Sequence, residues 1–298
     1  MDHRTPSDTA TLIARGTLLS ARDPDLAALL APDEEESVRR ILGDRASGGW
    51  FGFAMENSWA SRALMLAERF LLGGIFTHYL ARKRWIEKEV RQGLDQEIRQ
   101  VIVLGAGYDS LACRLAAQFP EVSFIELDHP ATQASKHAAL AGCPNLHFMP
   151  VDLGKTMPAD ALAACAAFDD SLPSIVVAEG LTMYFPEEKV AGILRSAASL
   201  AGEEGRVIFT FMELPEDGKL SFRGQSPVVA WWLRLRSEPF LWGCSRDELR
   251  GFLRACGLKL DAVANHRDLR SRILAPRRAA RLPLARGECL CLCHPLCS

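Results

Sequence analysis

The sequence predicts an α/β protein with a doubly wound, largely parallel sheet that is preceded by a helical N-terminal region. After Gln96, short runs of β-branched and apolar residues alternate with stretches of helical periodicity, as strands joined by crossover helices do. Before that point, apolar residues recur at three- and four-residue spacings without bunched strand signals. We therefore expect a helical cap over residues 1–95 and a sheet-containing domain over residues 96–298.

The expected strands follow one another at regular intervals along the second part. Their segments are QVIVLG, VSFIEL, LHFMPVD, SIVVAE and RVIFTFM, and the helices between them are LACRLAAQF, ATQASKHAAL, ADALAACAA and EEKVAGILRSAASLA. A polar stretch with proline and tryptophan over about residues 213–243 interrupts this alternation, and we interpret it as a lid. The helix SRDELRGFLRACG and two closing strands, LKLDAVAN and GECLCLCH, complete the expected domain.

The composition narrows the classes to which the protein can belong. Its 298 residues are 48% hydrophobic, which is enough for a substantial core, and the net charge is −2. Nucleic-acid-binding proteins usually show a clear basic excess, so we expect no nucleic-acid partner. Apolar runs are too short for a membrane span, and the start lacks the apolar core of a secretory signal. Nine scattered cysteines suit reduced thiols, so we expect a cytoplasmic enzyme that does not bind membranes.

The sharpest local feature is the segment VIVLGAGYDS, in which a strand runs directly into Gly105, Ala106 and Gly107 before a helix. In open α/β sheets, ligands bind at the carboxyl ends of the strands, where glycine lets the backbone approach them closely. The next strand ends in Asp128, about twenty positions further on, where a carboxylate can accept hydrogen bonds from ribose hydroxyls. The pair predicts a nucleoside-containing ligand, and an ordinary glycine-rich turn with a solvated aspartate is the alternative.

The glycine turn favours S-adenosylmethionine over a dinucleotide. The third glycine of the dinucleotide motif would fall at Ser110, and Asp109 would place a negative charge near a pyrophosphate. S-adenosylmethionine has no phosphate and carries an α-ammonium group, so an acidic turn suits it better. An NAD-dependent oxidoreductase and a non-catalytic module that binds S-adenosylmethionine remain the alternatives.

Several motifs occur in one order that resembles the leucine carboxyl methyltransferase family, which includes bacterial O-methyltransferases. They are HYLARKRWIEKEV, VIVLGAGYDSLACRLA, FIELDHPATQASK, VDL and VAEGLTMYF, spread over about Gly74 to Met212. The resemblance implies a Rossmann-like class I methyltransferase sheet of seven strands, the last of them antiparallel. It also implies an S-adenosylmethionine-dependent O-methyltransferase.

The resemblance further implies a set of cofactor-binding residues. Gly105 and Gly107 would form the turn, Asp128 would hold the ribose, Asp152 and Leu153 would neighbour adenine, Glu179 would lie beside the cofactor, and Arg82 would bind the methionine carboxylate. A guanidinium can hold a carboxylate through two charge-assisted hydrogen bonds. The competing interpretations are a helix N-cap for Asp152 and a solvated basic helix face for Arg82. Tyr108 stands where the family usually has an aliphatic residue. Some family members also use a lysine near the N-terminus, and no residue of this sequence is assigned to that role.

The expected acceptor is a small molecule or peptide, methylated on a carboxylate oxygen. A carboxylate is already ionised at neutral pH, so its attack needs no general base. Glu213 and His266 are the candidate bases if the acceptor is instead a hydroxyl. The lid offers aromatic residues to close over the acceptor and arginines to orient it: Trp231, Trp232, Phe240, Trp242, Arg223, Arg234 and Arg236.

The tail of the chain is cysteine-rich. Cys289, Cys291 and Cys293 alternate with leucines, which predicts one face of a final strand. Structural zinc sites use a second, distant cysteine pair that is missing here, so we expect no metal.

Overall fold

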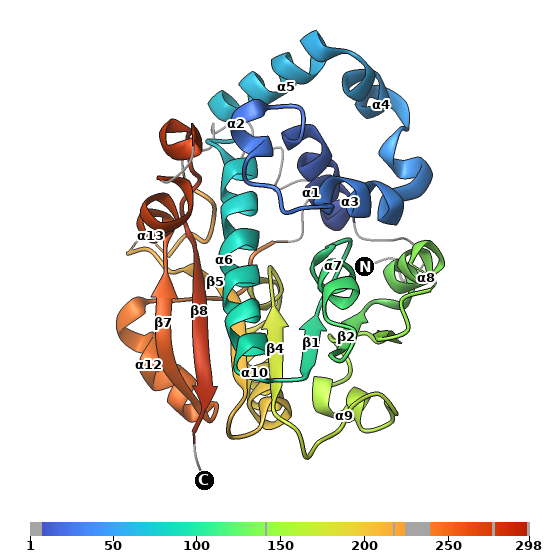
Figure 1. Ribbon diagram of the computed structural model, residues 1–298. Helices are drawn as coiled ribbons and strands as arrows, with labels where there is room; N and C mark the ends of the chain where they lie inside the picture. The colour runs from blue at the N-terminus through green and yellow to red at the C-terminus, as the bar shows by residue number, and fades with distance from the viewer. Residues whose placement is uncertain (1–7, 141, 217, 224–238, 276–277, 297–298) are drawn as a thin grey trace.

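A mixed sheet forms the centre of the protein in a computed structural model that describes residues 8–140, 142–216, 218–223, 239–275 and 278–296 (Figure 1). Within these residues the strand order is β3-β2-β1-β4-β5-β8-β7, and a short strand, β6, also pairs with β5. The strands are β1 (Gln100–Leu104), β2 (Ser123–Asp128), β3 (Leu146–Pro150), β4 (Ser174–Ala178), β5 (Arg206–Glu213), β6 (Gly243–Cys244), β7 (Leu258–Ala264) and β8 (Glu288–Pro295).

The sheet confirms the predicted fold class. Strands β1 to β5 run parallel to one another, whereas β8 runs antiparallel to both β5 and β7. The predicted strand segments all form strands, and the two-residue strand β6 is an addition. The helices that follow the strands are α7 (Leu111–Gln118), α8 (Pro130–Ala139), α9 (Pro158–Leu162), α10 (Glu187–Ala201), α12 (Arg246–Ala255) and α13 (His266–Leu269).

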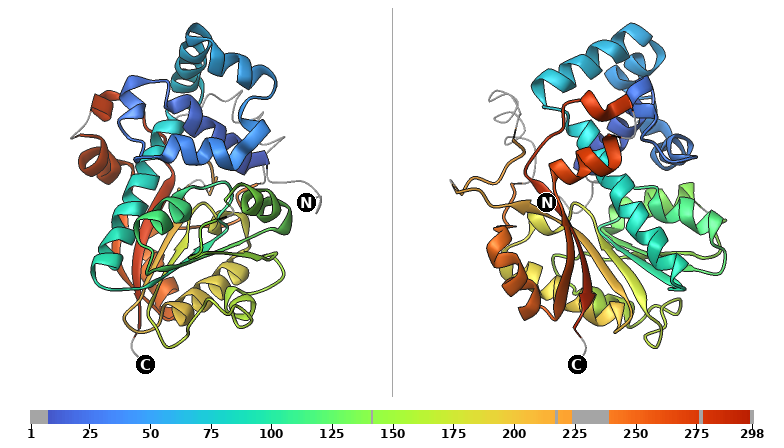
Figure 2. Two further views of the ribbon diagram at one scale, coloured as in Figure 1. Left: turned by 45° about the vertical axis from the view of Figure 1, so that its right-hand side comes forward. Right: turned by 60° about the vertical axis from the view of Figure 1, so that its left-hand side comes forward.

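The N-terminal residues are helical, as their periodicity predicts. They form α1 (Asp8–Ser20), α2 (Pro24–Ala27), α3 (Glu34–Leu42), α4 (Gly49–Glu56), α5 (Ser58–Leu71) and α6 (Ile75–Asp95). Figures 1 and 2 show α1 to α5 gathered beyond the carboxyl ends of the parallel strands, while the long helix α6 runs along the sheet. The first five helices therefore lie where ligands bind in folds of this kind.

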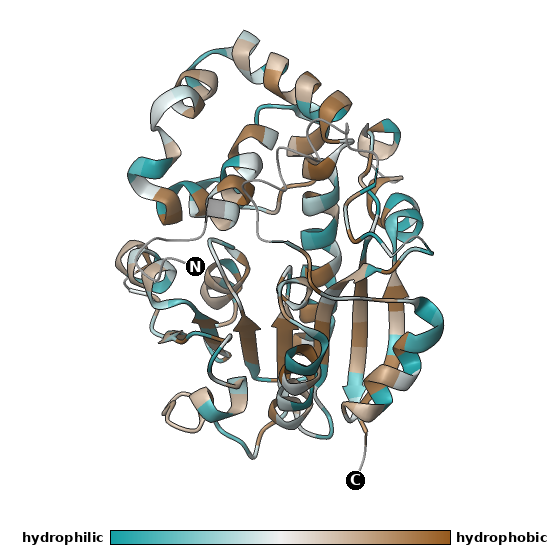
Figure 3. Cartoon of the chain, turned by 180° about the vertical axis from the view of Figure 1, so that it is seen from behind, coloured by the Kyte–Doolittle hydropathy of each residue, from teal (hydrophilic) through white to brown (hydrophobic). Residues whose placement is uncertain are grey.

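Two hydrophobic clusters cover the two faces of the sheet. In β1, Val101 and Val103 belong to the cluster that includes residues of α6 and α7, whereas Ile102 and Leu104 belong to the cluster on the α10 side. This alternation follows from the two-residue period of a strand. Because both faces are covered, the central strands read as almost continuous apolar runs, which Figure 3 shows as brown arrows.

The last strand follows the same rule. Leu290 and Leu292 pack in the α6-side cluster, and Cys289, Cys291 and Cys293 pack in the opposite one, so the prediction that the thiols share a face is confirmed. Burial raises the pKa of Cys291 well above its usual value, which keeps the thiol protonated. Metals bind the thiolate, so these cysteines act as core side chains.

Candidate active site

A cavity of about 610 Å³ lies at the carboxyl ends of the parallel strands. All seven predicted site residues line it: Arg82, Gly105, Gly107, Asp128, Asp152, Leu153 and Glu179. These residues come from α6 and from the ends of β1, β2, β3 and β4, so the sheet topology brings together segments that are far apart in sequence. Helix α1 closes another side of the cavity with Thr9, Ala10, Ile13, Ala14 and Thr17, none of which is cationic.

The turn after β1 needs glycine at two positions. Gly105 and Gly107 have φ values of 68° and 50°, in the left-handed region that side chains rarely adopt. A Cβ on Gly105 would also lie 2.7 Å from Leu181 Cδ1. The backbone can therefore pass closely beneath the cavity only because these residues lack side chains.

Asp128 is tied to the same turn. Its carboxylate accepts hydrogen bonds from the backbone amides of Gly107 and of His129, the latter at 2.6 Å. Burial raises the pKa of Asp128 despite these bonds. A carboxylate has about four lone-pair positions, so its oxygens keep capacity for ligand hydroxyls.

Asp152 closes a turn after β3. It accepts hydrogen bonds from the Gly154 amide at 2.9 Å and forms an ion pair with Lys155 at 3.1 Å. The following helix, α9, has Met157 at its N-cap, so the alternative role for Asp152 as that helix's cap is wrong. Its neighbour Leu153 is buried against the sheet.

Arg82 is buried, which rules out its interpretation as part of a solvated face. Its Nε donates to Glu179 Oε1 at 2.8 Å, and its NH1 lies 2.9 Å from both carboxylate oxygens of Glu288. The guanidinium also lies 4.7 Å from the ring centre of Tyr79. Burial works against the charge, but the two carboxylates outweigh this effect and raise the pKa of Arg82, so it stays protonated.

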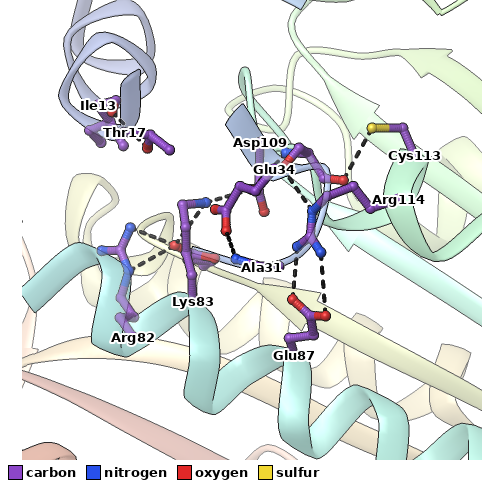
Figure 4. Close-up of polar contacts among 12 residues, drawn as sticks. Ile13, Thr17, Ala31, Glu34, Arg82, Lys83, Glu87, Asp109, Cys113 and Arg114 are labelled. Atoms are coloured by element: carbon purple, nitrogen blue, oxygen red, sulfur yellow. Dashed lines mark hydrogen bonds and ion pairs between the residues drawn. The ribbon is translucent and has the colours of Figure 1, made fainter. Parts of the chain in front are cut away.

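Lys83 is a further cation at the site, and it was not predicted from the sequence. Its Nζ pairs with Asp109 at 2.5 Å and lies 3.6 Å from Glu179 Oε1. Figure 4 shows Lys83 beside Arg82 on α6, with Asp109 on the facing turn. Burial opposes ionisation of Asp109, yet Lys83 lowers its pKa far below the usual range. Lys83 of α6 thus offsets the negative charge that Asp109 brings to the glycine turn.

Glu288, the second carboxylate partner of Arg82, was not predicted from the sequence either. The signal in the sequence was a single carboxylate that opens the otherwise apolar run CLCLC, but nothing local connects it to Arg82. The two residues lie 206 positions apart, and only the insertion of β8 beside β5 brings them together.

The segment interpreted as a lid is described only in part. Phe222, Pro239 and Leu241 line the cavity, and the Leu241 amide donates to Met183 O at 2.7 Å. Phe240 packs its ring 5.7 Å from that of Tyr184, at the cavity wall. Trp231, Trp232, Arg234 and Arg236 lie outside the described residues.

Three further expectations, about Trp242, the two candidate bases and Arg223, differ from what the structure shows. Trp242 does not cover the cavity, because it is buried in the core against Phe252. The candidate bases Glu213 and His266 are not among the residues that line the cavity. Arg223 does not line it either, and its backbone pairs with that of Arg286.

The described residues contain neither a candidate membrane span nor a candidate metal cluster. No helix there combines the length and the apolar character that crossing a membrane requires. Over the same residues, no three histidine, cysteine or acidic side chains gather as metal ligands would.

The profile of the leucine carboxyl methyltransferase family matches residues 22–198, which include β1 to β4 and all seven predicted site residues. The chain belongs to this family. It is 30% identical to a candidate S-adenosyl-L-methionine-dependent methyltransferase of Frankia alni, over 54% of this chain and 63% of the relative. A similar candidate of Mycobacterium avium is 27% identical over 68% of this chain and 66% of its own length. The chain spans about three fifths of the length of the curated relatives it matches.

A solved structure agrees with the fold of this family member. A candidate methyltransferase from Thermobifida fusca, 17% identical, has a TM-score of 0.57 and overlaps 87% of this chain and 93% of its own. At this identity the likeness concerns the fold alone, which is the class I methyltransferase sheet.

Proposed function

We propose that the protein is an S-adenosylmethionine-dependent O-methyltransferase and that the cavity holds the methyl donor. The observation that carries this proposal is the arrangement of charges in the cavity. A guanidinium and a carboxylate, Arg82 and Glu179, lie side by side at one end, and a second carboxylate, Asp128, lies at the glycine turn. The first pair suits the zwitterionic methionine group, and Asp128 suits ribose hydroxyls.

The roles of the individual residues follow from this orientation of the ligand. Arg82 would bind the α-carboxylate and Glu179 the α-ammonium group, since each then meets its opposite charge. Asp152 and Leu153 would flank adenine, and the glycines of the turn would let the ligand approach the backbone. S-adenosylmethionine supplies an electrophilic methyl group when bound. The chain's own part is to orient the acceptor and exclude water, and much of catalysis in such reactions is alignment.

We further propose that the acceptor is a carboxylate of a small molecule or peptide. The carboxylates that line the cavity are held by backbone amides or cations, and the two candidate bases lie elsewhere. His129 also lines the cavity, but its Nδ1 accepts from the Ala131 amide at 3.3 Å, so in the neutral ring Nε2 already carries the proton and cannot take one from an acceptor. A reaction that needs no proton removed fits such a site. The N-terminal region of residues 1–95 and the segment of about 213–243 would act as cap and lid, because described residues of both line the cavity.

The test has two stages. Calorimetry should detect S-adenosylhomocysteine binding and no NAD binding; the opposite result would favour the oxidoreductase. Purified enzyme, methyl-labelled S-adenosylmethionine and fractionated lysate should then give labelled product that releases methanol in mild base. Base-stable label would overturn the ester assignment, and tight binding without transfer to any fraction would favour the non-catalytic module.

A further inference from the structure

Glu288 lies directly behind Arg82, outside the cavity. Its side chain is completely buried, and both its oxygens contact Arg82 NH1 at 2.9 Å. On its other side, Oε2 lies 2.7 Å from Nε2 of His78, which is equally buried. Neither Glu288 nor His78 lines the cavity. Glu288 therefore reaches a ligand through Arg82, the cavity residue to which its side chain is bonded, whereas His78 also packs its ring 5.6 Å from that of Phe222, another cavity residue.

Stability alone does not account for a carboxylate at this position. Glu288 shares its face of β8 with Leu290 and Leu292, which pack in the apolar cluster beside α6. An apolar side chain at position 288 would extend that apolar face of β8. Replacing a buried ion pair by well-packed apolar groups is often neutral or stabilising, so the charge at 288 calls for another explanation.

The geometry around the Arg82 guanidinium supplies an explanation for the carboxylate at position 288. Glu179 engages Nε and NH2 of Arg82, and Glu288 engages NH1, so all three nitrogens are held from two strand ends. A guanidinium carries five N–H groups, and the two oxygens of one carboxylate lie close enough together to share a single N–H of NH1, so each terminal nitrogen keeps one N–H for another acceptor. A Cβ at Gly180, a cavity residue with a φ of 61°, would lie 3.7 Å from each of these nitrogens. The glycine thus leaves the terminal nitrogens uncovered on that side.

We infer that Glu288, supported by His78, is a positioning residue that fixes the Arg82 guanidinium so that its remaining N–H groups meet the carboxylate of the amino-acid group of the methyl donor. This inference rests on the proposed function. Both contacts with Glu179 are made to the single oxygen Oε1, about which the planar guanidinium could turn, whereas a second attachment to Glu288 at NH1 fixes its orientation. Preorganisation of this kind raises affinity because ligand binding then loses no free energy to ordering the side chain.

The test compares two ligands that differ in the group concerned. S-adenosylhomocysteine carries the amino-acid carboxylate, and 5′-methylthioadenosine lacks it. By calorimetry, Glu288→Gln should weaken S-adenosylhomocysteine binding by about tenfold or more, and change methylthioadenosine binding by less than about twofold. His78→Phe, which keeps a ring against Phe222, should give a smaller loss in the same direction; it also provides the measurement if Glu288→Gln does not fold.

Two controls separate positioning from a general effect of losing a buried ion pair. Glu87→Gln removes another buried carboxylate of an ion pair, between α6 and α7, and should leave both affinities within about twofold. On an Arg82→Lys background, Glu288→Gln should add little further loss, because the two residues act as a unit. Equal weakening of both ligands, or unchanged S-adenosylhomocysteine binding in folded variants, would overturn the inference. A wild-type protein that binds neither ligand would instead overturn the proposed function, and this inference with it.

Discussion

At the residue scale, Asp128 joins the glycine turn to the proposed ribose site. Asp128→Ala should weaken S-adenosylhomocysteine binding by about tenfold or more, because hydrogen bonds to a charged group contribute roughly 1.5–3 kcal/mol. Calorimetry measures this directly, and Asp169→Ala, a change at an exposed aspartate whose carboxylate accepts hydrogen bonds from nearby Ser171, is the matched control. Unchanged affinity in a folded Asp128→Ala variant would remove Asp128 from the site.

Arg82 permits a second prediction at this scale. Arg82→Lys should weaken S-adenosylhomocysteine binding by about tenfold, because an ammonium cannot reproduce the fork of a guanidinium that contacts two carboxylates of the protein and, in the proposal, a third in the ligand. Adenosine, which has no carboxylate, should bind the variant and the wild type alike in the same calorimeter. If both ligands lose affinity equally, the substitution acts on the fold and not on recognition of the carboxylate.

At the element scale, Glu87 of α6 ties this helix to α7. Its carboxylate lies 2.8 Å from Arg114 and 2.9 Å from Arg84. Burial opposes ionisation, but the arginines outweigh it and lower the pKa of Glu87 from 4.5 to about 2. The lowered pKa means that this stabilisation is complete above pH 4.5 and is lost as the pH falls towards 2.

The prediction concerns the difference in unfolding free energy between the wild type and Glu87→Gln. Urea unfolding should show the wild type more stable at pH 7, and this difference should shrink by roughly 2 kcal/mol at pH 3, since only the wild type titrates there. Glu97→Gln, at a carboxylate 87% exposed, should show the same small difference at both pH values. If the difference in unfolding free energy between the wild type and Glu87→Gln is the same at both pH values, the lowered pKa of Glu87 is contradicted.

Elements with a local pattern could be predicted from the sequence, and contacts between distant elements could not. The strand ending at the glycine turn and the one ending in Asp128 were predictable, because apolar runs and positive-φ glycines are local signals. Lys83 looked like one cation in a basic run, since its partner Asp109 comes from a different strand end. The contribution of α1 to the cavity was equally hidden, because Ala10 and Thr17 carry no chemical signature.

At the scale of the whole molecule, the cavity is shared between α1, α3, α6 and the strand ends. A ligand bound there contacts parts of the chain that separate on unfolding, so it binds the native state alone. At one hundred times its dissociation constant, S-adenosylhomocysteine should add about 2.7 kcal/mol and raise the Tm by roughly 5–10 °C. Thermal-shift measurements check this, with NAD as the control ligand. A shift produced by NAD and not by S-adenosylhomocysteine would contradict the proposal.

The position of β8 has a consequence for the order in which the protein is made. Among the described strands it is synthesised after all the others, yet it lies between β5 and β7 in the finished sheet. Until residues 288–295 have been synthesised, both neighbours expose an unpaired edge and Arg82 lacks one of its two carboxylate partners. Pairing across so long a separation is slow compared with local folding. Nascent chains that stop short of β8 should therefore neither retain the methyl donor nor resist proteases, so competence to bind arises only after translation has passed this strand.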